Sequence, residues 1–550
     1  MESNSSAQSS GRFAWGFCYW TALVAVFAWA TWLRFRLPLD PIADPDTWGY
    51  LSPALRKLIG AEFGHTNGRN FLYPGFLFLL LRLFGDFRAI TIVQHLLGLG
   101  AGAIFLLTWR RARVLLAHRR ADDRIYDALG LIGAAIFLCA AEPMHVEMQL
   151  RPESVCAFWV SLNIWLVLQF IACSWLENRQ IATAIYGIAV VFTAILLASL
   201  KPSFAVLALV AAIPVAVFFF RRDRLRQKAA IATGSVLSAT LLLLPEHLLS
   251  RNDEKSRTFL PATLFTIHAN LIRDQMAEDL RRGAQIPYAR DRLERVYSAL
   301  NSEVSKSGAA EQSRYHISAG FSPDYLMYDP TSITAQLRAQ FRGDISALCA
   351  FYRFYYWRTW RYRPLAVLQK VGRQMSIFYS WRCPAYYRAM SLPLAAEYER
   401  GVKSLDRPAY QRTWSAYAPA VEFMRRTAAL ARSAPAIQQR AYVRKPLGFL
   451  AATYLPLLFV SVGLGAFVLS RETHRRRFGW LAVLVVLLLS YNFTACLEVA
   501  VVHLLEYPRY ITVQMYFTLL AQFFAICFVV EIVLEMRAFL LTEKPAASPK

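Results

Sequence analysis

The chain has 550 residues, of which 56% are hydrophobic and only 18% charged, and its formal net charge is +24. Apolar runs of about 20 residues recur along it, which excludes a soluble globular protein and predicts an all-α polytopic membrane protein. Because the arginines cluster between these runs, membrane topology explains the charge better than nucleic-acid binding, and we expect no nucleic-acid partner.

About ten transmembrane helices are expected between two short tails. The polar residues 1–12 predict a disordered cytosolic tail, and residues 537–550 predict a second one. The apolar run after residue 12 lacks a small-residue cleavage site, so we interpret it as a retained helix. The predicted crossings are 13–33, 88–109, 126–141, 152–176, 181–200, 202–220, 229–249, 446–470, 478–504 and 510–536.

The arginine clusters predict the orientation of these helices. If the N-terminus is cytosolic, the basic linkers after the second, sixth and eighth crossings and the C-terminal tail all fall on the cytosolic side. The first outward loop, 34–87, and a large region, 250–445, then face the other side. This pattern is typical of a bacterial inner (plasma) membrane protein with both termini in the cytosol.

Five parts follow from this topology: a membrane core at 13–249, the periplasmic region 250–445, the C-terminal crossings 446–536, and the two tails. Within the periplasmic region, residues 332–375 carry apolar residues at helical spacing, with arginines and aromatics between them. We expect a mostly helical region that lies on the membrane surface or forms a lid over an outward cavity. No alternation is strong enough to predict a strand.

The first outward loop carries the most distinctive group of residues. Asp44 and Asp46 are separated only by Pro45, and Tyr50 follows Asp46 by one helical turn. A polar stretch then contains His65 and Arg69. About a dozen apolar residues beginning at 73 are too few to cross a bilayer but suit a helix at its surface. Acids, a cation and an interfacial helix beside a membrane suggest chemistry on a lipid-borne substrate.

Ionisable residues also gather at the other outward turns. Such residues near membrane depth are costly, so they either line one outward cavity or extend individually to the lipid headgroups. The set comprises Glu142, Glu147, Arg151, Glu153, Lys201, Glu506 and Arg509.

Several common site types are not predicted. The sequence has no Walker-type loop, no H-E-x-x-H and no G-x-S-x-G motif. Its cysteines show no zinc-binding spacing, although Cys349 and Cys383 can pair if their region is oxidising. No cofactor is predicted: the many acids are compatible with a divalent metal, but no ligand spacing demands one.

The outward motifs together resemble those of the C-type superfamily of membrane glycosyltransferases (GT-C), which includes protein O-mannosyltransferases, the lipid A aminoarabinose transferase and rhizobial galacturonosyltransferases. An acid precedes a tyrosine in the first outward loop, and a proline-led interfacial helix ends in Phe-Gly, like 73–85 here. The later matches are 151–154, 201–203 and the pair Arg509-Tyr510. The acids here are spaced by Pro45, and Tyr-Pro-Gly replaces a double proline, so the subfamily stays open.

The resemblance implies a polyprenyl-phosphate sugar donor, membrane lipids as partners, and a glycan, lipid or protein acceptor. Asp46 is then the base that takes the acceptor proton, with Asp44 the second choice; the alternative is that either acid caps a turn or helix. The expected outcome is inversion. Donor phosphate is expected to bind Arg509, Lys201 and Arg69. Sugar or acceptor contacts are expected from Glu142, Glu147, Glu153, His65 and Tyr50.

Two other functions share parts of this pattern. A flippase or transporter of a lipid-linked sugar favours broken helices and charges at mid-membrane, whereas here the charges gather at the outward ends. A ligase or polymerase of lipid-linked glycans uses the same kind of donor and has the same sequence features.

Overall fold

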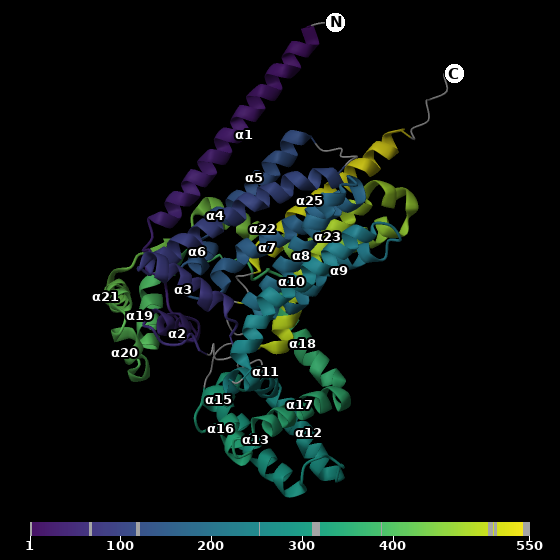
Figure 1. Ribbon diagram of the computed structural model, residues 1–550. Coiled ribbons are helices and arrows are strands. Elements are labelled where there is room, and N and C mark those ends of the chain that lie inside the picture. The colour runs from purple at the N-terminus through teal and green to yellow at the C-terminus, as the bar shows by residue number, and fades with distance from the viewer. Residues whose placement is uncertain are drawn as a thin grey trace.

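The computed structural model describes residues 3–64, 69–116, 122–251, 253–310, 320–386, 388–503, 510 and 514–542. The fold is all-α and 82% helical, with one two-stranded sheet among the described residues. Figure 1 shows long, roughly parallel helices above a lobe of shorter ones, with both termini at the end of the bundle away from that lobe.

Nine helices in the described ranges are long and apolar enough to cross a membrane. They indicate an integral membrane protein, as the sequence predicted. They are the Trp15–Phe35 part of α1 (Ser3–Phe35), α4 (Arg88–Arg111), α7 (Glu153–Ile171), α8 (Gln180–Leu200), α9 (Ala205–Phe219), α10 (Leu225–Ser250), α22 (Ala441–Ser470), α23 (Glu472–Val502) and α25 (Met515–Thr542).

The remaining predicted crossing, 126–141, coincides with a bent pair of helices. α5 (Asp123–Cys139) and α6 (Ala141–Glu147) meet at 52°, and counting them as one broken span gives ten. Several boundaries differ from expectation, and two of them are described here. α1 begins at Ser3, inside the expected tail, and α22 begins before Pro446 because a membrane helix tolerates an internal proline.

A buried ion pair joins three of the bundle helices. Arg34, fully buried at the end of α1, donates from Nε and Nη2 to the two carboxylate oxygens of Glu147, each at 2.8 Å. His95 Nδ1 in α4 lies 2.8 Å from the same carboxylate. The sequence predicted that Glu147 contacts the sugar or the acceptor. In the structure Glu147 instead belongs to this ion pair, because the bend after α5 directs the residue into the bundle.

The segment between α10 and α22 forms two bodies. The first, here called the lower lobe, has its own core built around Phe265, Val296, Leu326 and Tyr352. The lobe comprises α11 (Glu254–Ile267), α12 (Ala269–Arg282), α13 (Arg290–Ala310), α15 (Pro323–Tyr328), α16 (Ile333–Gln340), α17 (Ile345–Tyr362) and α18 (Pro364–Phe378). Helices were expected throughout this region, and α18 connects the lobe to α23 in the bundle.

The second body, here called the β1–β2 unit, is closed by a short antiparallel strand pair. It runs through β1 (Ser391–Pro393), α19 (Leu394–Leu405), α20 (Pro408–Ser415), α21 (Ala418–Ser433) and β2 (Ala436–Gln438). Strands of three residues are too short to show an alternating pattern, which is why the sequence did not predict them.

All eight cysteines lie among the described residues without forming a disulfide, and seven of them are buried. Cys349 Sγ faces the main-chain carbonyl of Arg257 in the lower lobe, whereas Cys383 belongs to the bundle core. The Cys349–Cys383 disulfide that the sequence allowed is therefore not formed.

Replacing Arg34 tests the buried pair. Arg34→Met leaves the Glu147 carboxylate buried without its main partner, which should cost about 3–5 kcal/mol of stability. We expect a clearly lower apparent melting midpoint in detergent, measured by fluorescence-detected size exclusion, and partial recovery in Arg34→Met/Glu147→Gln. The control is Arg36→Met, an exposed arginine two residues further along the chain. Equal midpoints for the two single variants would contradict the role of the pair.

Candidate active site

The predicted surface helix is present as α3 (Leu72–Phe84), an apolar helix too short to span a bilayer. It follows α2 (Thr47–Leu58), which begins directly after Asp46. The N-terminal end of α3 is bound by a carboxylate from another helix, since Glu246 in α10 accepts a hydrogen bond from the Phe71 amide at 2.8 Å. In the same way, Glu498 in α23 accepts from the Val206 amide at the start of α9, also at 2.8 Å.

A short main-chain bridge brings two outward segments together. The Ile42 amide donates to the Met148 carbonyl at 2.7 Å, and the Leu150 amide donates to the Ile42 carbonyl at 2.9 Å. These bonds align residues 42–46 with residues 148–151. As a result, the Asp44 carboxylate meets the Arg151 guanidinium in an ion pair.

Asp44 serves the local turn. Its Oδ1 accepts from the amides of Asp46 at 3.0 Å and Thr47 at 2.9 Å, and from the Thr47 hydroxyl at 2.9 Å, while Oδ2 faces Arg151. Both carboxylate oxygens are therefore occupied. Of the two interpretations of Asp44, the geometry favours the turn and cap residue.

Asp46 is arranged differently. It precedes α2, but its side chain makes no capping hydrogen bond, and its side chain is 34% exposed. Its Oδ1 accepts from Arg69 Nη2 at 2.8 Å, and the Arg69 guanidinium lies 4.8 Å from the centre of the Tyr50 ring. Burial by itself lowers the pKa of Arg69, but Tyr50 and Asp46 outweigh it and the pKa of Arg69 is raised.

The second charged group is formed by Glu153, at the start of α7, and Lys201, shortly before the start of α9. Lys201 Nζ is 3.3 Å from Glu153 Oε1, and it lies 4.9 Å from the centre of the Tyr510 ring. Both members of this ion pair are buried. Tyr73 contacts the first group, because its ring meets that of Tyr50 edge to face at 5.6 Å. Its hydroxyl donates to Gln94 Oε1 at 3.0 Å, and Glu153 is one of its electrostatic neighbours.

One further residue of this region was not predicted. Tyr328 ends α15 in the lower lobe, and its electrostatic neighbours include Asp46, Arg69 and Tyr510. Desolvation by neighbouring groups, then the carboxylates of Asp46 and Asp324, raise the pKa of Tyr328 to about 12, although 61% of the residue is accessible to solvent. Since no local pattern ties α15 to the first loop, the sequence carried no signal for this residue.

The other predicted site residues are dispersed. Glu142 is buried in α6 and faces Glu397 of the β1–β2 unit, and its Oε2 has no hydrogen bond within the described residues. Glu147 lies in the bundle pair with Arg34. His65 and Arg509 lie outside the described residues. The structure thus groups Asp46, Tyr50 and Arg69 on one side of Tyr73 and Glu153 with Lys201 on the other. Among the described residues, no three or more His, Cys, Asp or Glu side chains form a group that could hold a metal ion.

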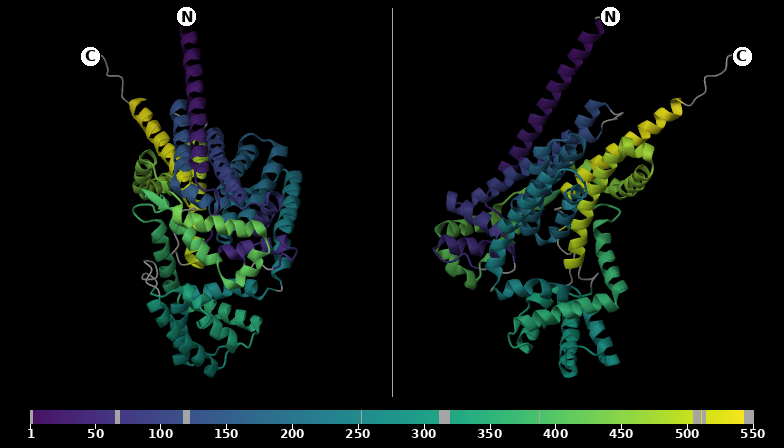
Figure 2. Two further views of the ribbon diagram at one scale, coloured as in Figure 1. Left: turned by 90° about the vertical axis from the view of Figure 1, so that its left-hand side faces the viewer. Right: turned by 45° about the vertical axis from the view of Figure 1, so that its right-hand side comes forward.

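The β1–β2 unit holds the first loop from the other side. Arg426 donates from Nε to Asp40 Oδ1 at 2.7 Å and from Nη2 to Asp86 Oδ1 at 2.8 Å, so it connects the two ends of the loop. The Tyr398 hydroxyl donates to the Asp40 carbonyl at 2.5 Å, and Trp48 of α2 stacks on Tyr410 at 4.1 Å between ring centroids. Figure 2 shows this unit beside the first-loop helices, apart from the lower lobe.

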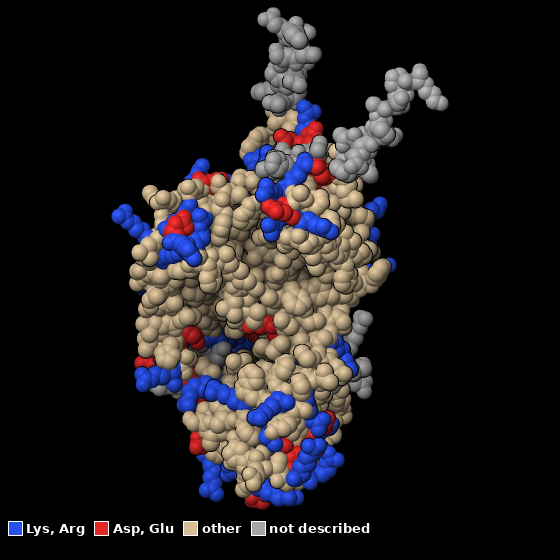
Figure 3. Space-filling view, turned by 90° about the vertical axis from the view of Figure 1, so that its right-hand side faces the viewer, with Lys and Arg blue, Asp and Glu red and all other residues tan. Residues whose placement is uncertain are grey.

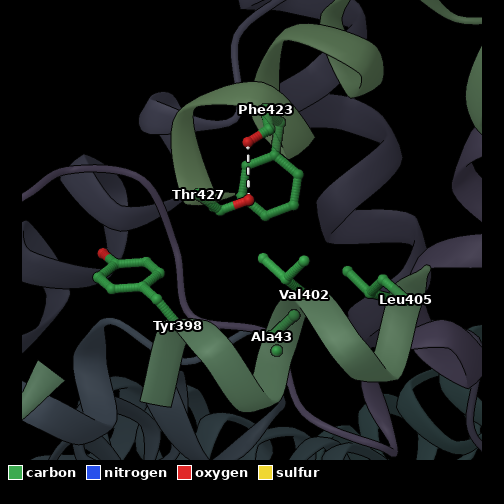
Figure 4. Close-up of a pocket in the computed structure, with 7 residues that line it drawn as sticks. Ala43, Tyr398, Val402, Leu405, Phe423 and Thr427 are labelled. Atoms are coloured by element: carbon green, nitrogen blue, oxygen red, sulfur yellow. Dashed lines mark hydrogen bonds between the residues drawn. The ribbon is translucent and has the colours of Figure 1, made fainter. Parts of the chain in front are cut away.

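A small apolar pocket lies within this contact. Figure 4 shows it between α19 and α21, next to Ala43 of the first loop. The Thr427 hydroxyl already donates to the Phe423 carbonyl at 2.9 Å, and the other lining side chains offer almost only carbon. At Gly401 a Cβ would lie 2.7 Å from the Ala43 carbonyl oxygen, so glycine permits this close packing. We interpret the pocket as a packing gap.

Comparison with protein-family models, with curated proteins and with solved structures finds no match to this chain.

Arg426→Gln tests whether the β1–β2 unit fixes the loop that carries Asp46. The substitution removes the charged contacts to Asp40 and Asp86 and should cost about 2 kcal/mol of local stability, or roughly 30-fold faster amide exchange at 40–50. Hydrogen–deuterium exchange measured by mass spectrometry checks this. The control is the neighbouring Arg425→Gln, whose side chain is exposed and, within the part of the chain that the structure describes, pairs with Glu422. The same exchange in both variants would contradict the role of Arg426.

Proposed function

We propose that the protein is a membrane glycosyltransferase that moves a sugar from a polyprenyl-phosphate donor to an acceptor at the periplasmic face of a bacterial inner membrane. The observation that carries the proposal is the difference between the two acids of the first loop. Asp44 has both oxygens occupied in a turn and an ion pair, whereas Asp46 is partly exposed beside Arg69 and Tyr50. The resemblance to GT-C enzymes supports the same assignment.

The chemistry of this reaction fits a carboxylate beside cations. The acceptor oxygen or nitrogen forms a bond to the anomeric carbon while the bond from that carbon to the phosphate oxygen breaks, and the acceptor proton passes to Asp46. Negative charge grows on the departing polyprenyl phosphate, so nearby cations lower the barrier. A single displacement of this kind inverts the anomeric centre.

The cations of the region differ in how well they are placed to bind the donor phosphate. Arg69 already holds the Asp46 carboxylate, so a phosphate that binds Arg69 releases that carboxylate to act as a base. Lys201 is buried against Glu153 and supplies a point charge from the opposite side of Tyr73. Arg509 stays a predicted phosphate ligand on its sequence position alone. Tyr50, Glu153 and the newly found Tyr328 can donate or accept hydrogen bonds from sugar hydroxyls.

The Asp46→Asn variant tests the base. Asparagine cannot take the acceptor proton, so transfer should fall by about 10²–10⁴-fold. The melting midpoint should change little, because Asp46 is partly exposed and the amide oxygen of asparagine can still accept the hydrogen bond from Arg69. The assay uses purified protein in nanodiscs, synthetic polyprenyl-phosphate sugars and extracted envelope acceptors. Glu62→Gln, an exposed acid of the same loop, is the control and should transfer like the parent.

The result also separates the alternatives. Transfer that survives Asp46→Asn removes the base assignment. If no lipid-linked donor is used while liposomes show movement of lipid-linked sugar, the protein is a flippase. Products longer than one sugar unit indicate a glycan ligase or polymerase. Mass spectrometry of envelope glycolipids from cells with and without the protein identifies the sugar and the acceptor.

A further inference from the structure

The segment between α18 and β1 enters the membrane bundle without forming a helix. The Cys383 amide donates to the Ala451 carbonyl of α22 at 3.0 Å, and the Tyr386 hydroxyl donates to Gln522 of α25 at 2.7 Å. At its start, the Tyr379 hydroxyl donates to Asn492 of α23 at 2.9 Å. Three membrane helices therefore hold this segment, and both Cys383 and Tyr386 are buried.

Helix geometry gives the depth of these contacts. At a rise of 1.5 Å per residue, Asn492 lies roughly 22 Å from the arginine cluster that ends at Arg477, and Gln522 lies roughly 22 Å from Arg537. Basic clusters mark the end of a crossing, and the hydrocarbon layer is about 30 Å thick. By the same measure Ala451, the third partner, lies roughly 30 Å from Arg471. The segment thus lies between the outer third of that layer and its outer boundary. Irregular backbone at such depth needs protein partners, which the three helices provide.

Two side chains of the segment are turned away from these partners. Trp381 is 70% exposed and Arg382 is exposed beside it, although the main chain of Cys383 next to them is bonded to α22. At this level the surroundings of the bundle are lipid. Tryptophan favours the boundary between acyl chains and headgroups, and arginine reaches from there to phosphate oxygens.

The charge of the whole stretch suits an anionic surface. Residues 364–390 contain four basic side chains and no Asp or Glu. One of them, Lys370, is used within the protein, because its Nζ donates to the Ala500 carbonyl near the end of α23 at 3.0 Å. Figure 3 shows that basic side chains also line the boundary between the bundle and the lower lobe on this side.

We propose that residues 379–386 form a re-entrant anchor that binds outer-leaflet glycerophospholipid. Trp381 lies at the acyl-chain boundary, and Arg382 binds the phosphate of the headgroup. The anchor fixes the height of α18, and with it the lower lobe, relative to the membrane. It does not depend on the reaction at Asp46.

The lower lobe offers a matched comparison. Trp357 in α17 is 65% exposed, similar to Trp381, and it also has arginines nearby in sequence. Yet α17 belongs to the lobe that projects beyond the end of the bundle, as both views in Figure 2 show. Two tryptophans of similar exposure therefore differ in their expected contact with lipid.

Depth-dependent quenching tests the position of Trp381. The full-length protein is placed in nanodiscs made of phosphatidylcholine with or without bromine on the acyl chains, and quenching of tryptophan fluorescence is measured. Because the chain has 14 tryptophans, the difference between variants is the readout. We expect Trp381→Phe to lose a component that bromine quenches and Trp357→Phe to lose an unquenched one. Equal quenching in the two variants overturns the proposal.

Lipid retention tests Arg382. Native mass spectrometry of protein released from phosphatidylglycerol-containing nanodiscs should show at least threefold less retained phosphatidylglycerol for Arg382→Gln, and no change for Arg361→Gln, an exposed arginine of α17. Matching melting midpoints confirm that both variants are folded. Unchanged retention overturns the proposal. If the variant retains phosphatidylglycerol but loses added undecaprenyl phosphate, the proposal is also overturned. Arg382 is then assigned to binding of the lipid-linked donor.

Discussion

The arrangement of the candidate site depends on two main-chain hydrogen bonds, those that join Ile42 to Met148 and Leu150. The segments they connect are far apart in sequence and leave different helices. Once they are paired, the Asp44 carboxylate lies against Arg151, and the remaining oxygen of Asp44 closes the turn that starts α2. Asp46 is then presented at the first turn of a well-anchored helix. The chemistry proposed for Asp46 therefore relies on Asp44 as its support.

The support continues outside the loop. The β1–β2 unit contacts the loop through Arg426, Tyr398 and Tyr410, and its own packing is close enough that Gly401 admits no side chain. The lower lobe approaches from another direction and brings Tyr328 near Asp46 and Arg69. One loop is thus held by the bundle, by the β1–β2 unit and by the lobe. Such multiple contacts favour a preorganised site over one that forms only on binding.

The sequence predicted the features that short-range patterns encode. Apolar runs of sufficient length gave the membrane helices, and the short run after Tyr73 gave α3. It also singled out Asp46, Tyr50 and Arg69, which the structure brings together. It could not assign Glu147, because an acid at an outward turn looks the same whether it meets solvent or a buried arginine from another helix. Tyr328 and the three-residue strands were not predicted for a related reason, since their partners are distant in sequence.

The two carboxylates that cap short helices have a consequence for anion recognition. The exposed amides at the start of a helix ordinarily attract phosphate. Glu246 already occupies that position at α3, and Glu498 occupies it at α9. These two main-chain amides are thus already bonded to side chains of the protein and are not open to an incoming diester. Discrimination between ligands then depends on guanidinium and ammonium side chains. A single amino-acid substitution can change the reach and orientation of these groups.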